Sequence, residues 1–434
     1  MQIFKKIIVY ILILESKLIL KKYKPFIVAV TGSVGKTTTK DAIYDVLRQR
    51  GGYVRKSEKS MNSDIGLPLT VLGVPNAWRD FRGWISNIQV GLKLIITRQS
   101  YPDTLVLEIG ADHPGDISNI AKWLRPDIAV ITKVGSTPVH VEFFKSPDEV
   151  FAEKASLAQY MKDKGTLILF ADEPKVLTIA DVVKEKQVNV VTFGMNEQAS
   201  LKGSKQTIIY DQHGAPTGFS FELVVAGEAV VIKVLGVIGF TYMYPLLAAA
   251  AVGKACGMSS GTLIQGLNSY QPPKGRMNIV HGMNGSTLID DTYNSSPDAV
   301  SAALQTVKHL NCTATKIAVL GDMMELGKYS SDQHRQIGRE VVGSVSRLIT
   351  IGQRSQATAN EAVKNGFDAN MVSSFDTSVD AATFLAPLVQ VGDIILVKGS
   401  QSIRAERIMK ALLREPEKAD KLLVRQEKEW LEKK

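Results

Sequence analysis

The sequence predicts an α/β protein. Its central domain is expected to have a doubly wound parallel sheet, a phosphate-binding loop (P-loop) and a small antiparallel patch, and a smaller Rossmann-like α/β domain is expected to follow. Short, continuously apolar segments alternate with helical stretches in both halves of the chain, as in parallel strands that helices cover on both faces. A turn rich in Gly and Thr joins the first of these strands to a helix. The 434 residues are enough for two or three domains.

In the central domain, strands are expected where several apolar residues follow one another. The parallel sheet is expected to contain residues 26–30, 105–109, 128–132 and 166–170, with helices at residues 36–50 and 116–124. Short segments separated by turns predict the antiparallel patch. Its expected strands are residues 189–192, 207–210, 219–225 and 229–234. An Ala-rich helix, residues 244–256, is expected after them.

The segment Gln-Pro-Pro-Lys-Gly at residues 271–275 is typical of a linker. The alternation of strands and helices then restarts. The expected strands are residues 287–289, 317–320, 347–351 and 393–397, and the expected helices are residues 297–308, 331–345 and 402–413. We therefore divide the chain into an N-terminal helix (1–24), a central domain (25–270), a C-terminal domain (271–415) and a charged helical tail (416–434), which we expect to be solvated.

The positive charge is concentrated at one end of the chain. Residues 1–60 contain 13 Lys and Arg but only 4 Asp and Glu, so they carry the whole net charge of +9. Nucleic-acid-binding domains spread such charge over their working surface, so an anionic substrate or an anionic membrane surface is the better interpretation. The two cysteines, Cys256 and Cys312, exclude a disulfide framework and fit a cytoplasmic protein.

The first 24 residues form a basic, largely apolar helix. The apolar run from Ile7 to Leu14 is flanked by lysines and is too short for a membrane span, which needs about 20 apolar residues. The Glu-Ser-Lys-Leu segment that follows offers no signal-peptide cleavage site. Besides a true span, two readings remain: the helix docks on the protein's own core, or it makes a peripheral membrane contact.

The strongest motif is Thr-Gly-Ser-Val-Gly-Lys-Thr-Thr at residues 31–38, between a strand and a helix. Glycines let backbone N–H groups approach phosphate oxygens, and the helix N-terminus adds positive partial charge. Lys36 is expected to reach the outer phosphates and Thr37 to bind Mg²⁺. The spacing Gly-x-x-Gly-Lys-Thr is shorter than in the usual P-loop, because Val30 stands where the first glycine would be.

Other candidate residues of the central domain are less specific by themselves. Glu108 ends a buried strand, where a carboxylate can bind Mg²⁺ or serve only as a cap or salt-bridge partner. His140 and Glu142 can both face a metal or phosphate, or both lie on the surface. The pattern around Lys154 predicts only a lysine on a helix.

Candidates of the C-terminal half lie in its linker and at its strand-to-loop junctions. Arg276 in the linker can reach a phosphate or form a hinge salt bridge, and Asp298 can act as a helix cap. The remaining candidates are Asp291, Asn294, Asp322, Glu325, Lys398 and Ser400. They suggest only the edge of a sheet where a site lies.

Six segments in this order resemble the Mur ligase family, the ATP-dependent amino-acid ligases of cell-wall peptide synthesis. They are TGSVGKTTTK, MNSDIGLPLTVLG, LEIGADHPGDI, DDTYNSSPDAVSAAL, VLGDMMELG and VKGSQSIRAERI. The resemblance covers residues 26–415 and is greatest to the branch that adds D-alanyl-D-alanine. It implies ATP and Mg²⁺ as cofactors, and a UDP-sugar peptide and a D-Ala-D-Ala-type dipeptide as substrates.

The resemblance also implies a role for each candidate. Catalysis is assigned to Lys36, Lys154 and His140. The nucleotide is assigned to Gly32, Ser33, Val34, Gly35, Lys36, Thr37, Thr38, Arg276, Asp291 and Asn294. Metal binding is assigned to Thr37, Glu108, His140 and Lys154, the last as a lysine carbamylated by CO₂. The acceptor side is assigned to Asp322, Glu325, Lys398 and Ser400.

The sequence departs from the family pattern in three places. The P-loop begins at residue 31, whereas in the family a substrate-binding domain precedes the P-loop. One expectation is therefore that a partner protein supplies that domain. The adenine neighbourhood reads Gly-Phe-Thr-Tyr-Met-Tyr-Pro at residues 239–245 instead of containing His-Asn, and residues 62–64 read Asn-Ser-Asp instead of Asn-Asn. Besides D-alanyl-D-alanine addition, two alternatives stay open: a ligase with another acceptor, such as a folylpolyglutamate-type enzyme, and a non-catalytic nucleotide-binding scaffold.

Overall fold

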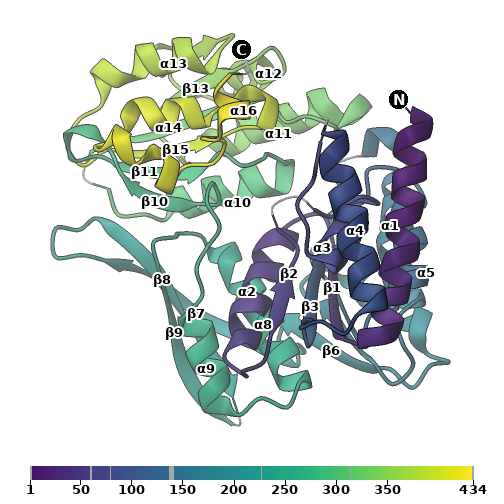
Figure 1. Ribbon diagram of the computed structural model, residues 1–434. Helices are drawn as coiled ribbons and strands as arrows, with labels where there is room; N and C mark the ends of the chain where they lie inside the picture. Colours follow the sequence, from purple (N-terminus) through teal and green to yellow (C-terminus); the bar gives the residue numbers. More distant parts are fainter. Residues whose placement is uncertain are drawn as a thin grey trace.

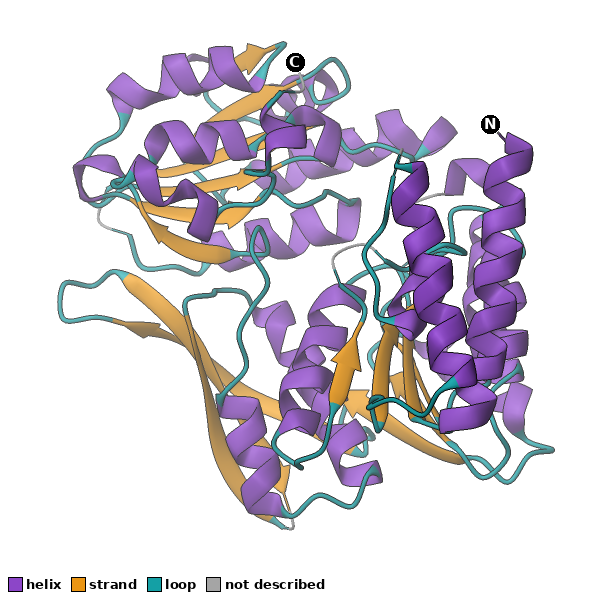
Figure 2. Cartoon of the chain, in the orientation of Figure 1, coloured by secondary structure: helices purple, strands orange, loops and turns teal. Residues whose placement is uncertain are grey.

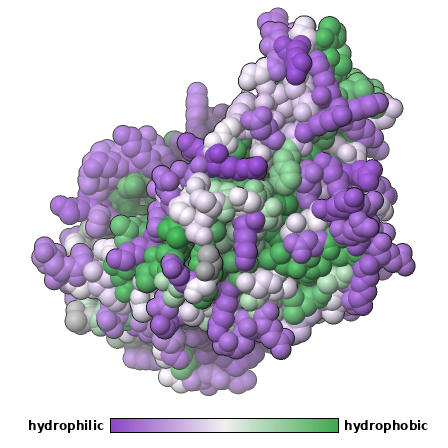
Figure 3. Space-filling view, turned by 90° about the horizontal axis from the view of Figure 1, so that it is seen from below, coloured by the Kyte–Doolittle hydropathy of each residue, from purple (hydrophilic) through white to green (hydrophobic). Residues whose placement is uncertain are grey.

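The computed structural model describes residues 2–58, 61–78, 80–135, 141–225, 227–312 and 314–432. Two sheets, each flanked by helices, form two bodies joined through the linker near residue 275 (Figure 1, Figure 2). Both predicted α/β units are therefore confirmed. Seen from below, hydrophobic residues form patches between hydrophilic side chains (Figure 3).

The central sheet has nine strands in the order β2-β3-β1-β4-β5-β6-β7-β8-β9. Their bounds are β1 Phe26–Thr31, β2 Val54–Lys56, β3 Thr104–Glu108, β4 Ile128–Ile131, β5 Thr166–Phe170, β6 Asn189–Gly194, β7 Leu201–Tyr210, β8 Pro216–Val225 and β9 Glu228–Leu235. Strands β1 to β6 run parallel, and β7 to β9 form the antiparallel patch. The prediction was wrong for β6, which pairs in parallel with β5 from Thr166↔Asn189 to Phe170↔Phe193.

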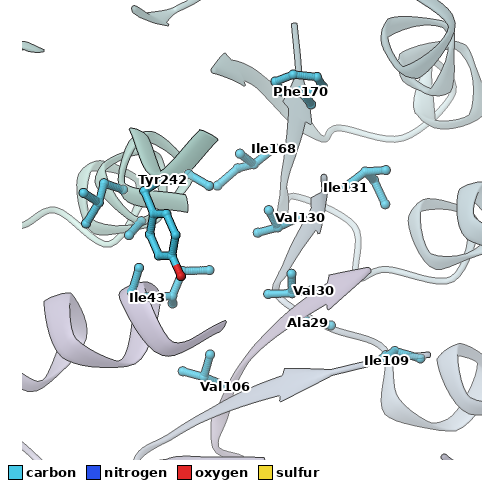
Figure 4. Packing of buried hydrophobic residues seen from close by; sticks show 14 of the residues in the cluster. Ala29, Val30, Ile43, Val106, Ile109, Val130, Ile131, Ile168, Phe170 and Tyr242 are labelled. Carbon is cyan, nitrogen blue, oxygen red and sulfur yellow. The ribbon is translucent and has the colours of Figure 1, made fainter. Parts of the chain in front are cut away.

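The helices of the central domain cover both faces of the sheet. Their bounds are α1 Gln2–Tyr23, α2 Lys36–Arg48, α3 Gly66–Leu72, α4 Phe81–Ile96, α5 Asp116–Leu124, α6 Pro147–Gln159, α7 Pro174–Leu177, α8 Met243–Ala255 and α9 Ser260–Asn268. The four consecutive alanines of α8 are buried, and their small side chains let this helix pack closely on α2. Apolar side chains of β1, β3, β4 and β5 fill the space around Ile43 of α2 and the ring of Tyr242 (Figure 4).

The C-terminal sheet has six strands in the order β10-β11-β15-β12-β13-β14. Their bounds are β10 Asn278–His281, β11 Thr287–Asp291, β12 Lys316–Gly321, β13 Arg347–Ile351, β14 Val372–Phe375 and β15 Ile394–Lys398. Only β10 runs antiparallel to its neighbour. The helices are α10 Pro297–Lys308, α11 Ser330–Val341, α12 Gln356–Lys364, α13 Ser378–Leu385 and α14 Glu406–Leu412.

The N-terminal helix α1 docks on the protein, as one of the two readings expected. Ile8, Leu12 and Ile19 are buried in the core, and α1 packs against α3 and α4. In the part of the chain that the structure describes, no helix combines the length and the apolar composition that crossing a bilayer requires.

The expectation of a solvated tail was wrong for part of the tail. After α14 the chain forms the short helices α15 Ala419–Leu422 and α16 Lys428–Leu431. Leu423 is buried, and so is Arg425, whose guanidinium donates to the carbonyl oxygens of Thr292 and Tyr293 and pairs with Glu406. Buried carbonyls need such donors, so the tail is an integral part of the C-terminal domain.

Candidate nucleotide and ligation site

The P-loop lies between the end of β1 and the start of α2. Gly32 (φ +146°) allows no larger residue, because a Cβ atom there would lie 1.9 Å from Oγ1 of Thr132. Gly35 (φ +82°) precedes Lys36, the first residue of α2, in the left-handed conformation that glycine favours. The N–H groups of Ser33 and Val34 donate to the Lys133 carbonyl at 2.8 and 3.1 Å, which fixes the loop to the segment after β4.

The first turn of α2 carries the residues expected to bind phosphate and Mg²⁺. Nζ of Lys36 folds back over the loop and donates to the Gly32 carbonyl at 3.1 Å. Burial lowers the pKa of Lys36, while the carboxylate of Glu108 counteracts that shift. Thr37 is partly exposed beside Lys36, and Thr38 lines the cleft described below.

The carboxylate of Glu108 is held at the end of β3. Nδ2 of Asn62 donates to Oε1 at 3.2 Å, and the hydroxyl of Ser57 accepts from the Glu108 N–H at 3.1 Å. The other oxygen, Oε2, is buried and has no hydrogen-bond partner among the described residues. A buried carboxylate oxygen without a partner costs free energy, and a divalent cation would stabilise it. The sequence pattern gave no signal for Ser57, and it gave Asn62 only as a departure from the family.

Lys154 lies on α6, fully buried. Burial, together with the charge of Lys36, lowers its pKa to about 7. The neighbouring Glu153 anchors this turn, because its carboxylate accepts from the backbone N–H groups of Gly115, Ile117 and Ser118 at the start of α5. Reasoning from the sequence did not find this anchor.

The expected metal site can be compared with the structure only in part, because His140 lies outside the described residues. The described residues contain no group of three or more His, Cys, Asp or Glu side chains arranged to hold a metal ion. Asp112 was missed by the sequence reading, and its charge acts on both Lys36 and Lys154. Lys36, Lys154, Glu108 and Asp112 therefore share one electrostatic environment at the carboxyl ends of the central strands.

In the C-terminal domain, Asp291 and Lys398 form a buried ion pair at 2.6 Å. Nζ of Lys398 also donates to the carbonyl oxygen of Asn294 at 2.9 Å. Burial lowers the pKa of Lys398, and Asp291 opposes the shift. These contacts fix the end of β11, where the expected nucleotide residue Asp291 lies, and the loop after it, which contains Asn294.

Arg276 lies at the junction of the two domains. Its guanidinium stacks over the ring of Tyr293 at 4.2 Å, and its carbonyl accepts from the hydroxyl of Tyr242. Its Nε is buried without a partner among the described residues, so it can still donate to an anion. Arg425 stacks on the same Tyr293 ring at 5.6 Å, which links the tail to this junction.

Both domains line a cleft of about 790 Å³ next to the P-loop. This volume is within the range of nucleotide and cofactor sites. The wall from the central domain includes Gly35, Thr38, Phe170, Phe193 and Tyr244, and the wall from the C-terminal domain includes Arg276, Asp291, Asp298, Ala302 and Lys398. An ion pair of 2.8 Å between Lys133 and Asp298 joins the two walls. Asp298 thus bridges the domains. It lies in the first turn of α10 and not at the N-cap position, which is Ser296, whose side chain makes no capping hydrogen bond.

The acceptor-side residues shape the loop after β12. Asp322 accepts from the Ser355 N–H at 2.7 Å, and the hydroxyl of Ser400 accepts from the Met324 N–H at 3.0 Å. Both expected substrate residues therefore have contacts within the domain. Glu325, at φ +63°, lies in the same loop, which meets the central domain where Gly327 packs on Glu142.

Comparison with known proteins matches both domains to family models. The Mur ligase middle domain matches residues 30–253, and the Mur ligase glutamate ligase domain matches residues 275–401. The UDP-N-acetylmuramoyl-tripeptide--D-alanyl-D-alanine ligase of Mycobacterium leprae is 31% identical over 87% of this chain and 71% of its own length. The enzyme of the same name from Bacillus subtilis is 28% identical over 92% of this chain and 79% of its own.

Solved structures of similar fold include Mur ligases. The MurF ligase of Thermotoga maritima, in complex with ADP, has a TM-score of 0.76 and 25% identity, covering 94% of this chain and 84% of that one. A folylpolyglutamate synthase of Mycobacterium tuberculosis, at 14% identity and a TM-score of 0.64, shares the fold alone. The matched domain models, the coverage of the relatives and the shared architecture together show that the chain belongs to the Mur ligase family.

Proposed function

We propose that this chain is an ATP-dependent ligase that joins D-alanyl-D-alanine to the carboxylate of a UDP-MurNAc-tripeptide through an acyl phosphate. The observation that carries the proposal is the P-loop beside a cleft that both domains line, with the charge of its Lys36 acting together with that of Glu108, which has an unpartnered oxygen, and of the buried Lys154. The names of the Mycobacterium leprae and Bacillus subtilis relatives supply the substrate class.

The triphosphate of ATP would lie along the P-loop, where the first turn of α2 presents backbone N–H groups and the positive end of its dipole. Thr37 and Glu108 would hold Mg²⁺, which neutralises phosphate charge when it is bound. Arg276, whose Nε is free among the described residues, would bind phosphate from the C-terminal side. These roles match the residues that the resemblance assigned.

Lys154 is suited to carbamylation. Only a neutral amine attacks CO₂, and a pKa of about 7 leaves a large neutral fraction at physiological pH. The amine nitrogen bonds to the carbon of CO₂ and releases one proton, giving a carbamate anion. This change replaces a cation that repels Mg²⁺ with an anion that attracts it.

The reaction follows in two steps. A carboxylate oxygen of the tripeptide attacks the γ-phosphorus of ATP, ADP leaves, and an acyl phosphate forms while Lys36 stabilises the charge on the transferred group. The amine of the dipeptide then attacks the acyl carbon, phosphate leaves, and the nitrogen loses a proton to give the amide. We assign the loop that carries Glu325 to the side of the dipeptide, as the resemblance implies.

ADP release by the purified chain tests the proposal, with ATP and Mg²⁺ and with each substrate present or absent. Release is expected only when UDP-MurNAc-tripeptide and D-alanyl-D-alanine are both present. K36A should lose more than about a thousand-fold in turnover. K122A changes a lysine of α5 that does not line the cleft described above, and it should retain wild-type turnover. Release with a glutamate acceptor instead would favour a folylpolyglutamate-type reaction, and equal function of K36A would favour a scaffold.

A further inference from the structure

Helix α1 exposes a row of large apolar side chains that the protein's core does not use. Ile7, Tyr10, Leu14 and Leu18 are 40–65% exposed. They recur every three or four residues, so they lie on one face of the helix, next to the face that Ile8, Leu12 and Ile19 bury.

Helix α4 carries a second row of the same kind. Phe81, Ile85, Leu92 and Ile96 are 42–78% exposed and follow helical spacing. The buried face of α4 is separate and contains Trp84 and Leu94 among others. Each helix is therefore apolar both toward the core and along one exposed row.

The two helices lie side by side and run parallel (Figure 1). Nζ of Lys22 donates to the carbonyl oxygens of Leu94, Ile95 and Thr97, so the C-terminal ends of both helices meet. Further toward their N-termini, Glu15 lies against Gly91, where a Cβ atom would come within 2.2 Å of the carboxylate.

The Glu15–Gly91 contact fixes the direction of both rows. At about 100° of rotation per residue, the row on α1 lies roughly 90° to one side of this contact, and the row on α4 lies roughly 90–110° to the other side. Because the helices are parallel, opposite rotations bring both rows to the same side of the pair. The eight side chains thus form one apolar face, which we call the α1/α4 face.

Basic residues border this face. Lys17 and Lys21 are exposed on α1, and Arg82 and Lys93 are exposed on α4. Between residues 2 and 24 the only acidic residue is Glu15, and residues 81–98 contain none. Glu15 is buried, so it adds no negative charge to the exposed surface.

We propose that the α1/α4 face docks on an anionic lipid surface, with its apolar rows in the acyl boundary and its lysines and arginines at the headgroups. An apolar stripe bordered by cations is the arrangement of helices that lie in the plane of a membrane interface. The charge selects anionic lipid over a neutral bilayer, because each basic residue near such a surface contributes to binding. The helices lie on the membrane and do not cross it.

Co-sedimentation of the full chain with vesicles tests the proposal without any need for turnover, so it is independent of the proposed reaction. The probes are phosphatidylcholine vesicles and vesicles with one quarter phosphatidylglycerol. We expect binding to the anionic vesicles, weakened by salt, and far less binding to the neutral ones. K17E/K21E should lower the partition coefficient by at least roughly 30-fold, which corresponds to the loss of two cationic contacts.

L14Q/L18Q removes apolar side chains that are already exposed and should lower binding while leaving the fold intact. The matched control is V224Q/V231Q, which changes equally exposed apolar residues of β8 and β9 and should bind like the wild type. Equal binding to neutral and anionic vesicles, or no binding, would overturn the proposal. So would a lipid-free dimer that L14Q/L18Q dissociates, because the face would then belong to a second copy of the chain.

Discussion

Glu15 makes a measurable prediction about the attachment of helix α1. The side chain is 4% exposed, and neither carboxylate oxygen has a hydrogen-bond partner among the described residues. Burial raises its pKa from 4.5 to about 7. No cation among the described residues pairs with Glu15 to oppose this shift. Helix α3 contains no titratable residue, and Nζ of Lys22 donates to backbone carbonyls of α4.

The direction of the effect follows from linkage. When α1 detaches, Glu15 ionises near pH 4.5, whereas in the docked helix it ionises near pH 7. The docked state therefore has its full stability below pH 4.5 and loses stability as the pH rises through 7. A shift from 4.5 to about 7 corresponds to at most about 3 kcal/mol, and relaxation around a carboxylate in a two-helix interface reduces this to about 2 kcal/mol.

The perturbation is E15Q, which keeps the shape and removes the titration. Hydrogen exchange of α1 amides, followed by mass spectrometry from pH 5 to pH 8 and corrected for intrinsic rates, measures the opening free energy of this helix locally. At pH 5 the detached Glu15 is already partly ionised, so we expect about four-fold higher protection of E15Q there. At pH 8 we expect about 30-fold higher protection of E15Q, the equivalent of about 2 kcal/mol. Parallel pH profiles for the two proteins would refute the reasoning.

Three more predictions concern the site. K154A should abolish turnover, and added acetate should restore part of it. For the wild type, the CO₂ concentration needed for activity should fall as the pH rises from 6 to 8, because the amine of Lys154 becomes neutral above pH 7. Wild-type activity that does not depend on CO₂ would contradict this prediction. R425A leaves the carbonyl of Thr292 without its donor and should raise KM for ATP about ten-fold with a smaller change in kcat, whereas R425K should restore part of it. D298A removes a partly exposed ion pair between the domains and should change KM for ATP less than about five-fold, because exposed pairs contribute at most about 1 kcal/mol. A hundred-fold change would contradict this and show that the ion pair controls how the two domains come together around ATP.

The sequence predicted the parallel strands and the P-loop well because their signals are local. A strand buried on both faces needs a continuous apolar run, and residues 26–30 and 128–132 contain one. The glycines of the loop are likewise dictated by local geometry, as Gly32 shows. Such features depend on few distant residues, so composition and spacing reveal them.

The missed features depend on distant partners. Helix α3 is buried on every side, so its sequence has no helical alternation of polar and apolar residues. The direction of β6 is set by its pairing with β5 and not by its own residues. The burial of Arg425 depends on carbonyls 132 and 133 residues earlier in the chain, which no local pattern indicates.

Lys133 contacts both the P-loop and the C-terminal domain. Its carbonyl oxygen accepts from Ser33 and Val34 of the P-loop, and its side chain reaches Asp298 of the other domain. A single residue therefore links the P-loop to the C-terminal domain. Thermodynamic reciprocity then requires that any factor by which nucleotide strengthens the contact between the domains is also the factor by which this contact strengthens nucleotide binding.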